Sequence, residues 1–201
     1  STPINEVLFD SEHKLNSSWS FWYASRKQKD HLIPYEKRLK KFAQFSSVEN
    51  FFKHYVYIKS ASDIDRNTDI SLFKNDFKPL WESCTNSGII FVRFKKHENL
   101  NEIDLKWEKL LFALIGEQFD DESILGSTLS IRGRETIIEL WFDYQSNDNL
   151  KVSLIEKFKE LLEFDKSMIV YFKDNSLSLK DGSTLKNVET VIINNRKNTY
   201  F

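Results

Sequence analysis

The sequence is poor in the residues that build disulfide frameworks and phosphate-binding turns. Cys84 is its one cysteine, so the chain can form no internal disulfide, and a reducing compartment is the simpler interpretation. The five glycines are scattered and form neither a GxGxxG turn nor a GxxxxGK(S/T) loop, which are the patterns that cradle phosphates. The sequence therefore does not indicate a nucleotide-hydrolysing enzyme.

Long apolar runs and an excess of positive charge are also missing. No stretch approaches the roughly 20 apolar residues that span a bilayer, and the first ten residues, STPINEVLFD, do not read as a secretory signal. The net charge is −1 and the pI is near 6.4, so a general polyanion-binding surface is not expected. We expect a soluble protein with no membrane partner, in which any contact with nucleic acid is local.

Metal-binding and catalytic patterns are equally scarce. The histidines at positions 13, 31, 54 and 97 show no paired spacing with cysteines or carboxylates of the kind that metal sites use. The acidic run Asp120–Glu122 follows the end of a predicted helix, which favours a solvated loop over a general acid–base pair. We therefore expect a binding module with no metal, no cofactor and no catalytic residue, and not an enzyme.

Aromatic residues are abundant, with 17 Phe, 7 Tyr and 5 Trp in 201 residues. Hydrophobic residues make up 40% and charged residues 29%, which is globular usage, and the length suits one core. No repeat or linker divides the chain. We expect a flexible arm at 1–12 and a single domain at 13–201, with most rings in its core.

The spacing of apolar residues predicts both strands and helices. Strands joined partly by hairpins, with about three helices between them, are typical of the α+β class. We expect a curved antiparallel β-sheet with the helices on its convex face and a concave side free for a ligand. A capping box, Ser46-x-x-Glu49, starts the first helix and Gly116 ends the second. Predicted strands are Trp19–Ala24, Gly88–Phe94, Leu125–Arg132, Thr136–Tyr144 and Met168–Phe172, and predicted helices have apolar faces over 48–55, 103–114 and 150–162.

Several motifs combine aromatic, acidic and basic residues in one order along the chain. Together they extend from about His13 to Asn187 and resemble the translation initiation factor 4E family of mRNA cap-binding proteins. The leading motifs are Tyr35-Glu36, Leu72-Phe73-Lys74-x-x-x-x-Pro79-Leu80-Trp81-Glu82, and Ser130-Ile131-Arg132-Gly133-Arg134 before Leu140-Trp141. Further matches are Phe21-Trp22-Tyr23, Phe45-x-x-Val48-Glu49-x-Phe51, Leu114-Ile115-Gly116-Glu117-x-Phe119 and Lys180-x-Gly182-Ser183-Thr184-x-Lys186-Asn187.

The resemblance implies a slot for the 7-methylguanosine cap between two aromatic walls, Tyr35 and Trp81. Guanine methylated at N7 is positively charged, so two electron-rich rings attract it by cation–π interaction in addition to stacking. Glu82 would accept hydrogen bonds from the N1–H and the exocyclic amine of the base. Trp141 would contact the N7-methyl group, although a buried strand residue is an equally good interpretation of it.

The cap triphosphate needs fixed cations, and the planar fork of arginine suits phosphate oxygens. The resemblance places Arg132, at the end of a predicted strand, on the phosphates. Arg134, Lys180 and Lys186 are further candidates, because a few local cations reconcile an acidic pI with an anionic ligand.

The resemblance also implies a partner-binding face on the convex side. There the scaffold initiation factor 4G or a 4E-binding protein would dock a helix with the pattern Tyr-x-x-x-x-Leu-Φ. Phe52 could equally belong to the core, because a helix stripe of this kind usually faces inward. The candidate partner-binding residues are His13, Leu15, Val48, Phe52, Glu108, Leu111 and Phe112.

The chain departs from the family pattern at several positions. Tyr35 replaces the more common Trp, as in the branch that includes cap-binding translational repressors, and Ile89 stands where many members have a basic residue. Lys14 replaces Pro, Phe52 replaces Trp, and Glu108-Lys109 replaces Leu-Glu on the partner face. These changes predict weaker binding of the cap phosphates and an altered preference among partner proteins.

The sequence thus predicts a monomeric cytoplasmic protein, with a nuclear location left open, that binds capped mRNA and controls translation initiation through its partner. The alternative is an interaction module of the same fold with weak or no cap binding, acting as a translational repressor or regulator. A cap-hydrolysing enzyme would need metal-binding carboxylates at helical spacing, and no such motif is present in the sequence.

Overall fold

The computed structural model describes residues 12–26, 32–95, 99–165 and 167–191, so most of the predicted arm at 1–12 lies outside it. None of the described helices combines the length and the apolar character that a membrane crossing requires. The strands are β1 (Lys14–Ser25), β2 (Lys40–Ser47), β3 (Thr68–Lys74), β4 (Ser87–Lys95), β5 (Ile124–Ile131), β6 (Glu135–Asp143), β7 (Val170–Asp174) and β8 (Glu189–Val191). The helices are α1 (Tyr35–Arg38), α2 (Val48–Tyr55), α3 (Leu100–Ile115), α4 (Asp148–Leu161), α5 (Asn175–Asp181) and the 3-10 helix η2 (Trp81–Ser83).

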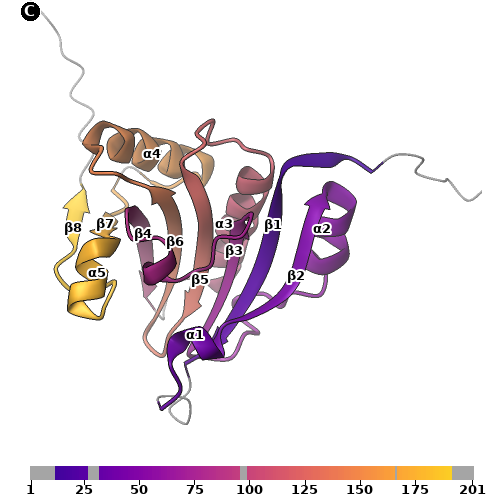
Figure 1. Ribbon diagram of the computed structural model, residues 1–201, viewed down its shortest axis with the longest axis horizontal. Coiled ribbons are helices and arrows are strands. Elements are labelled where there is room, and N and C mark those ends of the chain that lie inside the picture. Colours follow the sequence, from indigo (N-terminus) through magenta and orange to yellow (C-terminus); the bar gives the residue numbers. More distant parts are fainter. Residues whose placement is uncertain (1–11, 27–31, 96–98, 166, 192–201) are drawn as a thin grey trace, which may run out of the picture.

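The described strands form one curved sheet in the order β2-β1-β3-β5-β6-β4-β7-β8. Figure 1 shows this order from β2 at the right to β8 at the left. Every pair of neighbouring strands is antiparallel. The α+β prediction is confirmed, with the tight hairpin around Gly133 joining β5 to β6.

Two apolar clusters lie on opposite faces of the sheet. Side chains of a strand alternate between the faces, and in β1 the rings of Trp19, Phe21 and Tyr23 pack with the long helices while Trp22 joins the other face. The larger cluster contains buried residues of α2, α3 and α4. The smaller one surrounds Trp141 and has Trp81 packed against it. The face without the long helices is therefore the one that carries the candidate site.

The predicted elements agree with the structure except at some boundaries and omissions. The cap of α2 is Ser47, whose hydroxyl accepts from the Asn50 N–H at 3.3 Å, so the prediction of Ser46 was wrong by one residue. Strand β2 continues through Ser46, and the helix can begin only after it ends. Strand β3 was not predicted, although Asp69, Ile70, Ser71 and Leu72 alternate between polar and apolar as the residues of a half-buried strand do.

Candidate functional site

A cavity of about 470 Å³ opens on the face of the sheet opposite the long helices. Tyr35 of α1, Trp81 and Glu82 of η2, and Trp141 of β6 all line it. We call this cavity the slot. The structure thus gathers, from segments far apart in the sequence, the two residues predicted as walls, the predicted carboxylate and Trp141, which was predicted to contact the N7-methyl group and which we call the floor of the slot.

The first wall, Tyr35, is fixed by polar contacts at both ends of its short helix. Its hydroxyl donates to Asp69 Oδ2 at 3.0 Å, and Arg38 ties α1 to β1 by donating to the Ser25 carbonyl at 2.8 Å. The Arg26 guanidinium lies 4.4 Å from the centre of the Tyr35 ring. Burial and the nearby Asp69 carboxylate raise the pKa of the Tyr35 hydroxyl well above its usual range, so it stays protonated and donates.

The second wall, Trp81, lies in η2 and packs against the smaller apolar cluster. The segment after it is held by Asn175 of α5, whose side-chain amide donates to the Cys84 carbonyl at 3.3 Å and to Ser87 Oγ at 2.5 Å. Glu82, which follows Trp81, is exposed. Within the described part of the chain no hydrogen bond or ion pair engages its carboxylate, which is therefore available to a ligand.

The floor of the slot is Trp141, which is 4% exposed. The Phe73 ring meets it edge to face with 5.4 Å between centroids. Gly126 makes this packing possible, since a Cβ there would lie 2.7 Å from the Phe73 ring. The indole N–H of Trp141 donates to Glu139 Oε2 at 3.0 Å, which fixes the orientation of the floor.

Arg132, the predicted phosphate ligand, is engaged in a buried cluster around Asp69. Its Nη2 lies 2.6 Å from Asp69 Oδ1, and Arg26 Nε lies 2.7 Å from Oδ2 of the same carboxylate. Ser130 donates to Oδ1 at 2.7 Å. Burial opposes ionisation of Asp69, yet the two arginines hold its pKa below the usual range. Arg132 does not line the slot, and much of its charge is compensated by Asp69.

The other predicted cations lie further out. Arg134, Lys180 and Lys186 are exposed and are not among the residues that line the slot. Arg38, which the sequence analysis did not single out, does line it, 5.4 Å from the centre of the Tyr35 ring. Phosphate binding by the predicted residues stays a prediction, and a phosphate would have to extend from the slot to reach them.

Sequence reasoning missed four charged groups of the site: Arg26, Arg38, Asp69 and Glu139. Glu139 stands between apolar residues of β6, and that placement is a signal that could have revealed it, whereas Asp69 of β3 has the polar residues Thr68 and Ser71 close to it and gives a weaker signal. A charged residue is seldom fully buried unless it is paired. Arg26 follows directly after β1 and shows no such signal.

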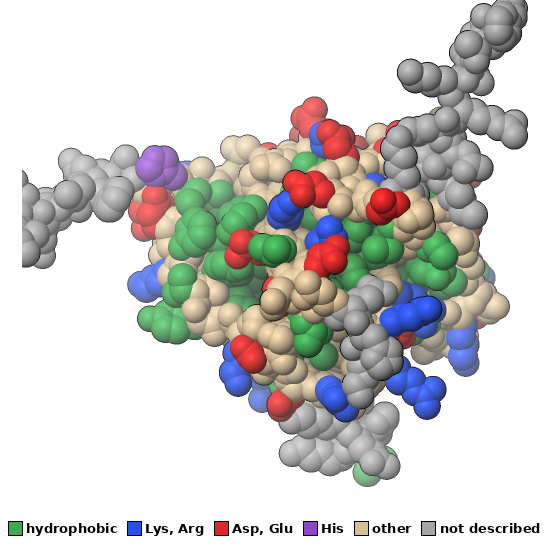
Figure 2. Space-filling model, turned by 180° about the vertical axis from the view of Figure 1, so that it is seen from behind, with side chains coloured by type: hydrophobic (Ala, Val, Ile, Leu, Met, Phe, Trp, Pro, Cys, Tyr) green, Lys and Arg blue, Asp and Glu red, His purple; other side chains and the backbone are tan. Residues whose placement is uncertain are grey.

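The predicted partner-binding residues gather on the other side of the molecule, around α2 and α3. Phe52 is 42% exposed, so it is not a core residue, and its ring lies 5.8 Å from that of Phe112. Val48 is partly buried, and its N–H donates to the His13 carbonyl at 2.9 Å. We call the surface of Val48, Phe52 and Phe112 the partner face. Figure 2 shows hydrophobic side chains gathered at this end of the molecule.

The other residues predicted for the partner face differ in exposure, from the exposed His13 to the buried Leu111. Leu111 is fully buried, so it lies beneath the face and the prediction that it contacts a partner needs correction. Leu15 packs against the core, and His13 is held by Glu49 with 2.7 Å between Nδ1 and Oε1. Glu108 accepts a hydrogen bond from the Tyr55 hydroxyl.

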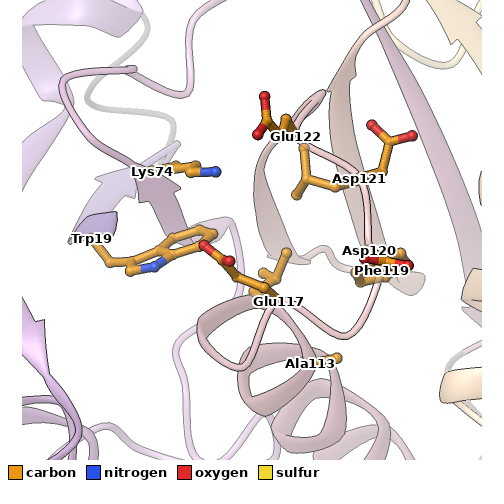
Figure 3. Close-up of a pocket in the computed structure, with 10 residues that line it drawn as sticks. Trp19, Lys74, Ala113, Glu117, Phe119, Asp120, Asp121 and Glu122 are labelled. Carbon is orange, nitrogen blue, oxygen red and sulfur yellow. The ribbon is translucent and has the colours of Figure 1, made fainter. Parts of the chain in front are cut away.

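A further cavity, of about 360 Å³, lies at the C-terminal end of α3. Figure 3 shows Trp19 and Lys74 on one side of it and the carboxylates of Asp121 and Glu122 on the other. The aromatic residues that line this cavity, Trp19 and Phe119, are buried, whereas Tyr35 and Trp81 of the slot are partly exposed, so it offers a flat ligand less ring surface than the slot does. In the described segments no group of His, Cys, Asp and Glu side chains is arranged to hold a metal ion.

Comparison with known proteins identifies the family of the chain. The family model "Eukaryotic initiation factor 4E" matches residues 14–190. The translation initiation factor NCBP of Arabidopsis thaliana is 33% identical over 183 residues, which is 90% of this chain and 81% of that protein. Isoform 4E-2 of Triticum aestivum is 34% identical over 171 residues, 84% of this chain and 80% of that protein.

Solved structures of similar fold include complexes with ligands. Ascaris suum eIF4E-3 with an m2,2,7G cap has a TM-score of 0.79 and 28% identity, covering 90% of this chain and 98% of that one. Caenorhabditis elegans eIF4E-3, with the 4E-binding protein Mextli and a cap analogue, has a TM-score of 0.77 and 26% identity, covering 85% and 96%. The chain described here therefore belongs to the eukaryotic initiation factor 4E family.

Proposed function

We propose that this protein binds the 7-methylguanosine 5′ cap of mRNA and thereby controls translation initiation. The observation that carries the proposal is the slot, in which Tyr35, Trp81 and Trp141 surround a space next to the free carboxylate of Glu82. A space of about 470 Å³ lies within the usual range of small-ligand sites. The cap-bound structures of nematode relatives support the same use of the fold.

Recognition of the base rests on its positive charge and its flat shape. The methylated base stacks between Tyr35 and Trp81, with cation–π attraction from both rings. Glu82 accepts the N1–H and the exocyclic amine in a charge-assisted pair, and the Trp81 backbone N–H donates to the guanine carbonyl. Trp141 lies at the floor, within reach of the N7-methyl group. The work of the site is binding, and no bond is broken.

Phosphate recognition uses Arg132, with Arg134 and Lys180 nearer the solvent. The Asp69 cluster holds the Arg132 guanidinium in one orientation, which lowers the entropy that a ligand would otherwise have to remove. The same pairing reduces the charge that a phosphate experiences. We therefore expect the triphosphate to add less affinity than three unpaired cations would give.

The partner face serves the second half of the function. Phe52 and Phe112 offer neighbouring rings to an amphipathic helix with the pattern Tyr-x-x-x-x-Leu-Φ, from the scaffold initiation factor 4G or a 4E-binding protein. The complex of a nematode relative with the 4E-binding protein Mextli supports this use of the family fold. We infer a monomer that acts in the cytoplasm.

Titration of the protein with 7-methylguanosine triphosphate tests the proposal, with quenching of tryptophan emission as the signal. Trp81→Ala and Glu82→Ala should each lower affinity by at least about a hundredfold, which is about 2.7 kcal/mol. Circular dichroism must match the parent for either variant to count. Unchanged affinity of Glu82→Ala would remove that residue from the site.

The compensated charge of Arg132 favours one alternative, an interaction module that has lost useful cap affinity and acts as a repressor or regulator. The two functions separate in the same titration. If millimolar ligand leaves the emission of the parent protein unchanged while a Tyr-x-x-x-x-Leu-Φ peptide still binds, the alternative holds.

A further inference from the structure

Among the described residues, no cation forms an ion pair with the buried carboxyl group of Glu139 in the slot. Glu139 is 8% exposed, lies in β6 two residues before Trp141, and shares its face of the sheet. The hydrogen bond from Trp141 Nε1 is the one bond to its carboxyl among the described residues. Buried carboxylates are normally paired with a cation or a metal ion. Glu139 lines the slot together with Tyr35 and Trp81, so a ligand can supply the missing charge.

The protein's own cations near Glu139 are committed elsewhere. Arg26 and Arg132, which face it from the ends of β1 and β5, both pair with Asp69 of β3 at 2.7 and 2.6 Å. Opposite Glu139 on β5 stands Thr128, whose hydroxyl bonds to that of Ser71 at 2.9 Å. On the η2 side the slot is lined by a further carboxylate, Glu82. Arg38 also lines the slot and donates to the Ser25 carbonyl, but with Arg26 it is outnumbered by the lining carboxylates Glu36, Asp69, Glu82 and Glu139, so the empty slot is electronegative.

The ionisation of Glu139 is balanced close to neutral pH. Burial raises its pKa to about 7, against the stabilising hydrogen bond from Trp141. The negative charge of Asp69 raises the pKa further, and the charges of Arg132 and Arg26 lower it. A cation brought into the slot would favour the ionised form. The group can therefore respond to the charge of what the slot contains.

We propose that Glu139 is a specificity-determining residue of the slot, which makes it prefer a positively charged flat base over a neutral base of the same shape. The inference rests on the proposed function and adds to it. Aromatic walls stack on either base, because every base has a π-face. A carboxylate distinguishes them, because its attraction acts on net charge and is weakly screened in a buried site.

Proton release is a consequence that can be measured. The free protein holds a proton on Glu139 for most of the time below its pKa, and the bound cation displaces that proton. Release should be large at pH 6, smaller at pH 7 and absent above about pH 8, where Glu139 is already ionised. Selectivity for the charged base should accordingly grow from about pH 5 to about pH 7, below the pH at which the methylated base loses its own charge.

The experiment compares the parent protein with Glu139→Gln, which keeps the shape of the side chain and removes its charge. Asp143→Asn is the matched control, since Asp143 lies on the same strand and does not line the slot. Affinities for 7-methylguanosine triphosphate and for GTP give a preference ratio for each protein. We expect Glu139→Gln to lower this ratio about tenfold, equivalent to about 1.4 kcal/mol, and Asp143→Asn to leave it within about twofold of the parent value.

Calorimetry provides the second readout. Binding of 7-methylguanosine triphosphate at pH 6 in two buffers of different ionisation enthalpy counts the protons released. The methylated base titrates by itself near neutral pH, and subtracting the signal of Glu139→Gln from that of the parent removes this contribution. The difference should approach one proton per ligand.

The outcomes separate a failure of the proposed cap binding from a failure of the role assigned to Glu139. A parent protein that binds neither nucleotide overturns the proposed function and this inference together. A parent that prefers the methylated nucleotide while Glu139→Gln keeps the same ratio overturns the inference alone. If Glu139→Gln loses affinity for both nucleotides equally and releases as many protons as the parent, Glu139 only orients Trp141. That result also overturns the inference.

Discussion

The slot and the partner face both present aromatic rings, yet they hold those rings by different means. In the slot, the Tyr35 hydroxyl and the Trp141 indole N–H donate to buried carboxylates, Asp69 and Glu139. On the partner face, Phe52 is held by ring contacts with Phe51, Tyr55 and Phe112 at 5.1 to 6.3 Å. One surface is therefore oriented by charge and the other by apolar packing.

This difference fits the ligand that each surface would take. Binding of a cationic base and its phosphates requires protein charges at fixed positions. Buried charged side chains are held in one orientation, because leaving them unpaired is costly. A helix from a partner protein needs apolar area, and exposed rings can adjust to it. Perturbations of charge and pH should consequently affect the slot much more than the partner face.

The largest effect should come from Asp69→Asn, which leaves Arg26 and Arg132 next to each other without their shared anion. Removing one partner of a buried ion pair costs about 3–5 kcal/mol, and we expect a loss of about 3 kcal/mol in the free energy of unfolding, because both arginines keep some contact with solvent. Urea denaturation measures it. Glu36→Gln is the control, since the Glu36–Lys78 pair at 3.7 Å is exposed and should cost at most about 1 kcal/mol. Similar losses in both variants would contradict a special role for the Asp69 cluster.

A pH-dependent stability difference between the parent and Glu139→Gln should follow. The pKa of Glu139 rises from 4.5 to about 7 on folding, so between these values the folded state binds more protons and the parent loses stability as the pH rises. The loss of stability that comes from ionising the buried Glu139 is absent below about pH 4.5, grows up to about pH 7 and is constant above it. The free energy of unfolding of Glu139→Gln should thus exceed that of the parent, by up to about 3 kcal/mol at pH 7 and above. Thermal unfolding from pH 5 to pH 8 measures the gap, and a constant gap would show that Glu139 ionises normally.

How much of the site the sequence could predict depends on whether its residues are neighbours in the chain. Trp81 and Glu82 are adjacent in a recognisable motif, so they were found. The Asp69 cluster is formed by Arg26 and Arg132, which lie 43 and 63 residues away in the chain, and no local pattern joins residues at such distances. Leu111 belonged to the apolar stripe of its helix, and the burial that this stripe predicts outweighed the family match. The sheet's alternation and the helix ends are local signals, so the fold was predicted more completely than the charge network.

On the partner face, Phe52→Ala should reduce binding of a Tyr-x-x-x-x-Leu-Φ peptide by about 2 kcal/mol, the scale of an interface hot spot. Cap affinity should stay within about twofold, because the slot lies on the opposite face of the sheet and distant sites act independently. Isothermal calorimetry with the two ligands separates these effects. Loss of both ligands together with a lower melting temperature would mean that Phe52 stabilises the fold as a whole, and unchanged peptide affinity would mean that the partner docks elsewhere.

The smallest effect should come from Tyr35→Phe, which keeps the stacking ring and removes the hydroxyl that Asp69 holds at 3.0 Å. A hydrogen bond to a charged group contributes about 1.5–3 kcal/mol to stability. Because Asp69 keeps Arg26, Arg132 and Ser130 as partners, the free energy of unfolding should fall by only about 1 kcal/mol. The freed ring can rotate out of the slot, and we expect cap affinity to fall about threefold to fivefold without any change in peptide binding. Tyr35→Trp is the informative counterpart: it enlarges the stacking surface but cannot restore the phenolic donor. If Trp binds the cap more tightly than Tyr, stacking area governs the first wall; if Trp and Phe are weakened alike, the orientation imposed by Asp69 governs it.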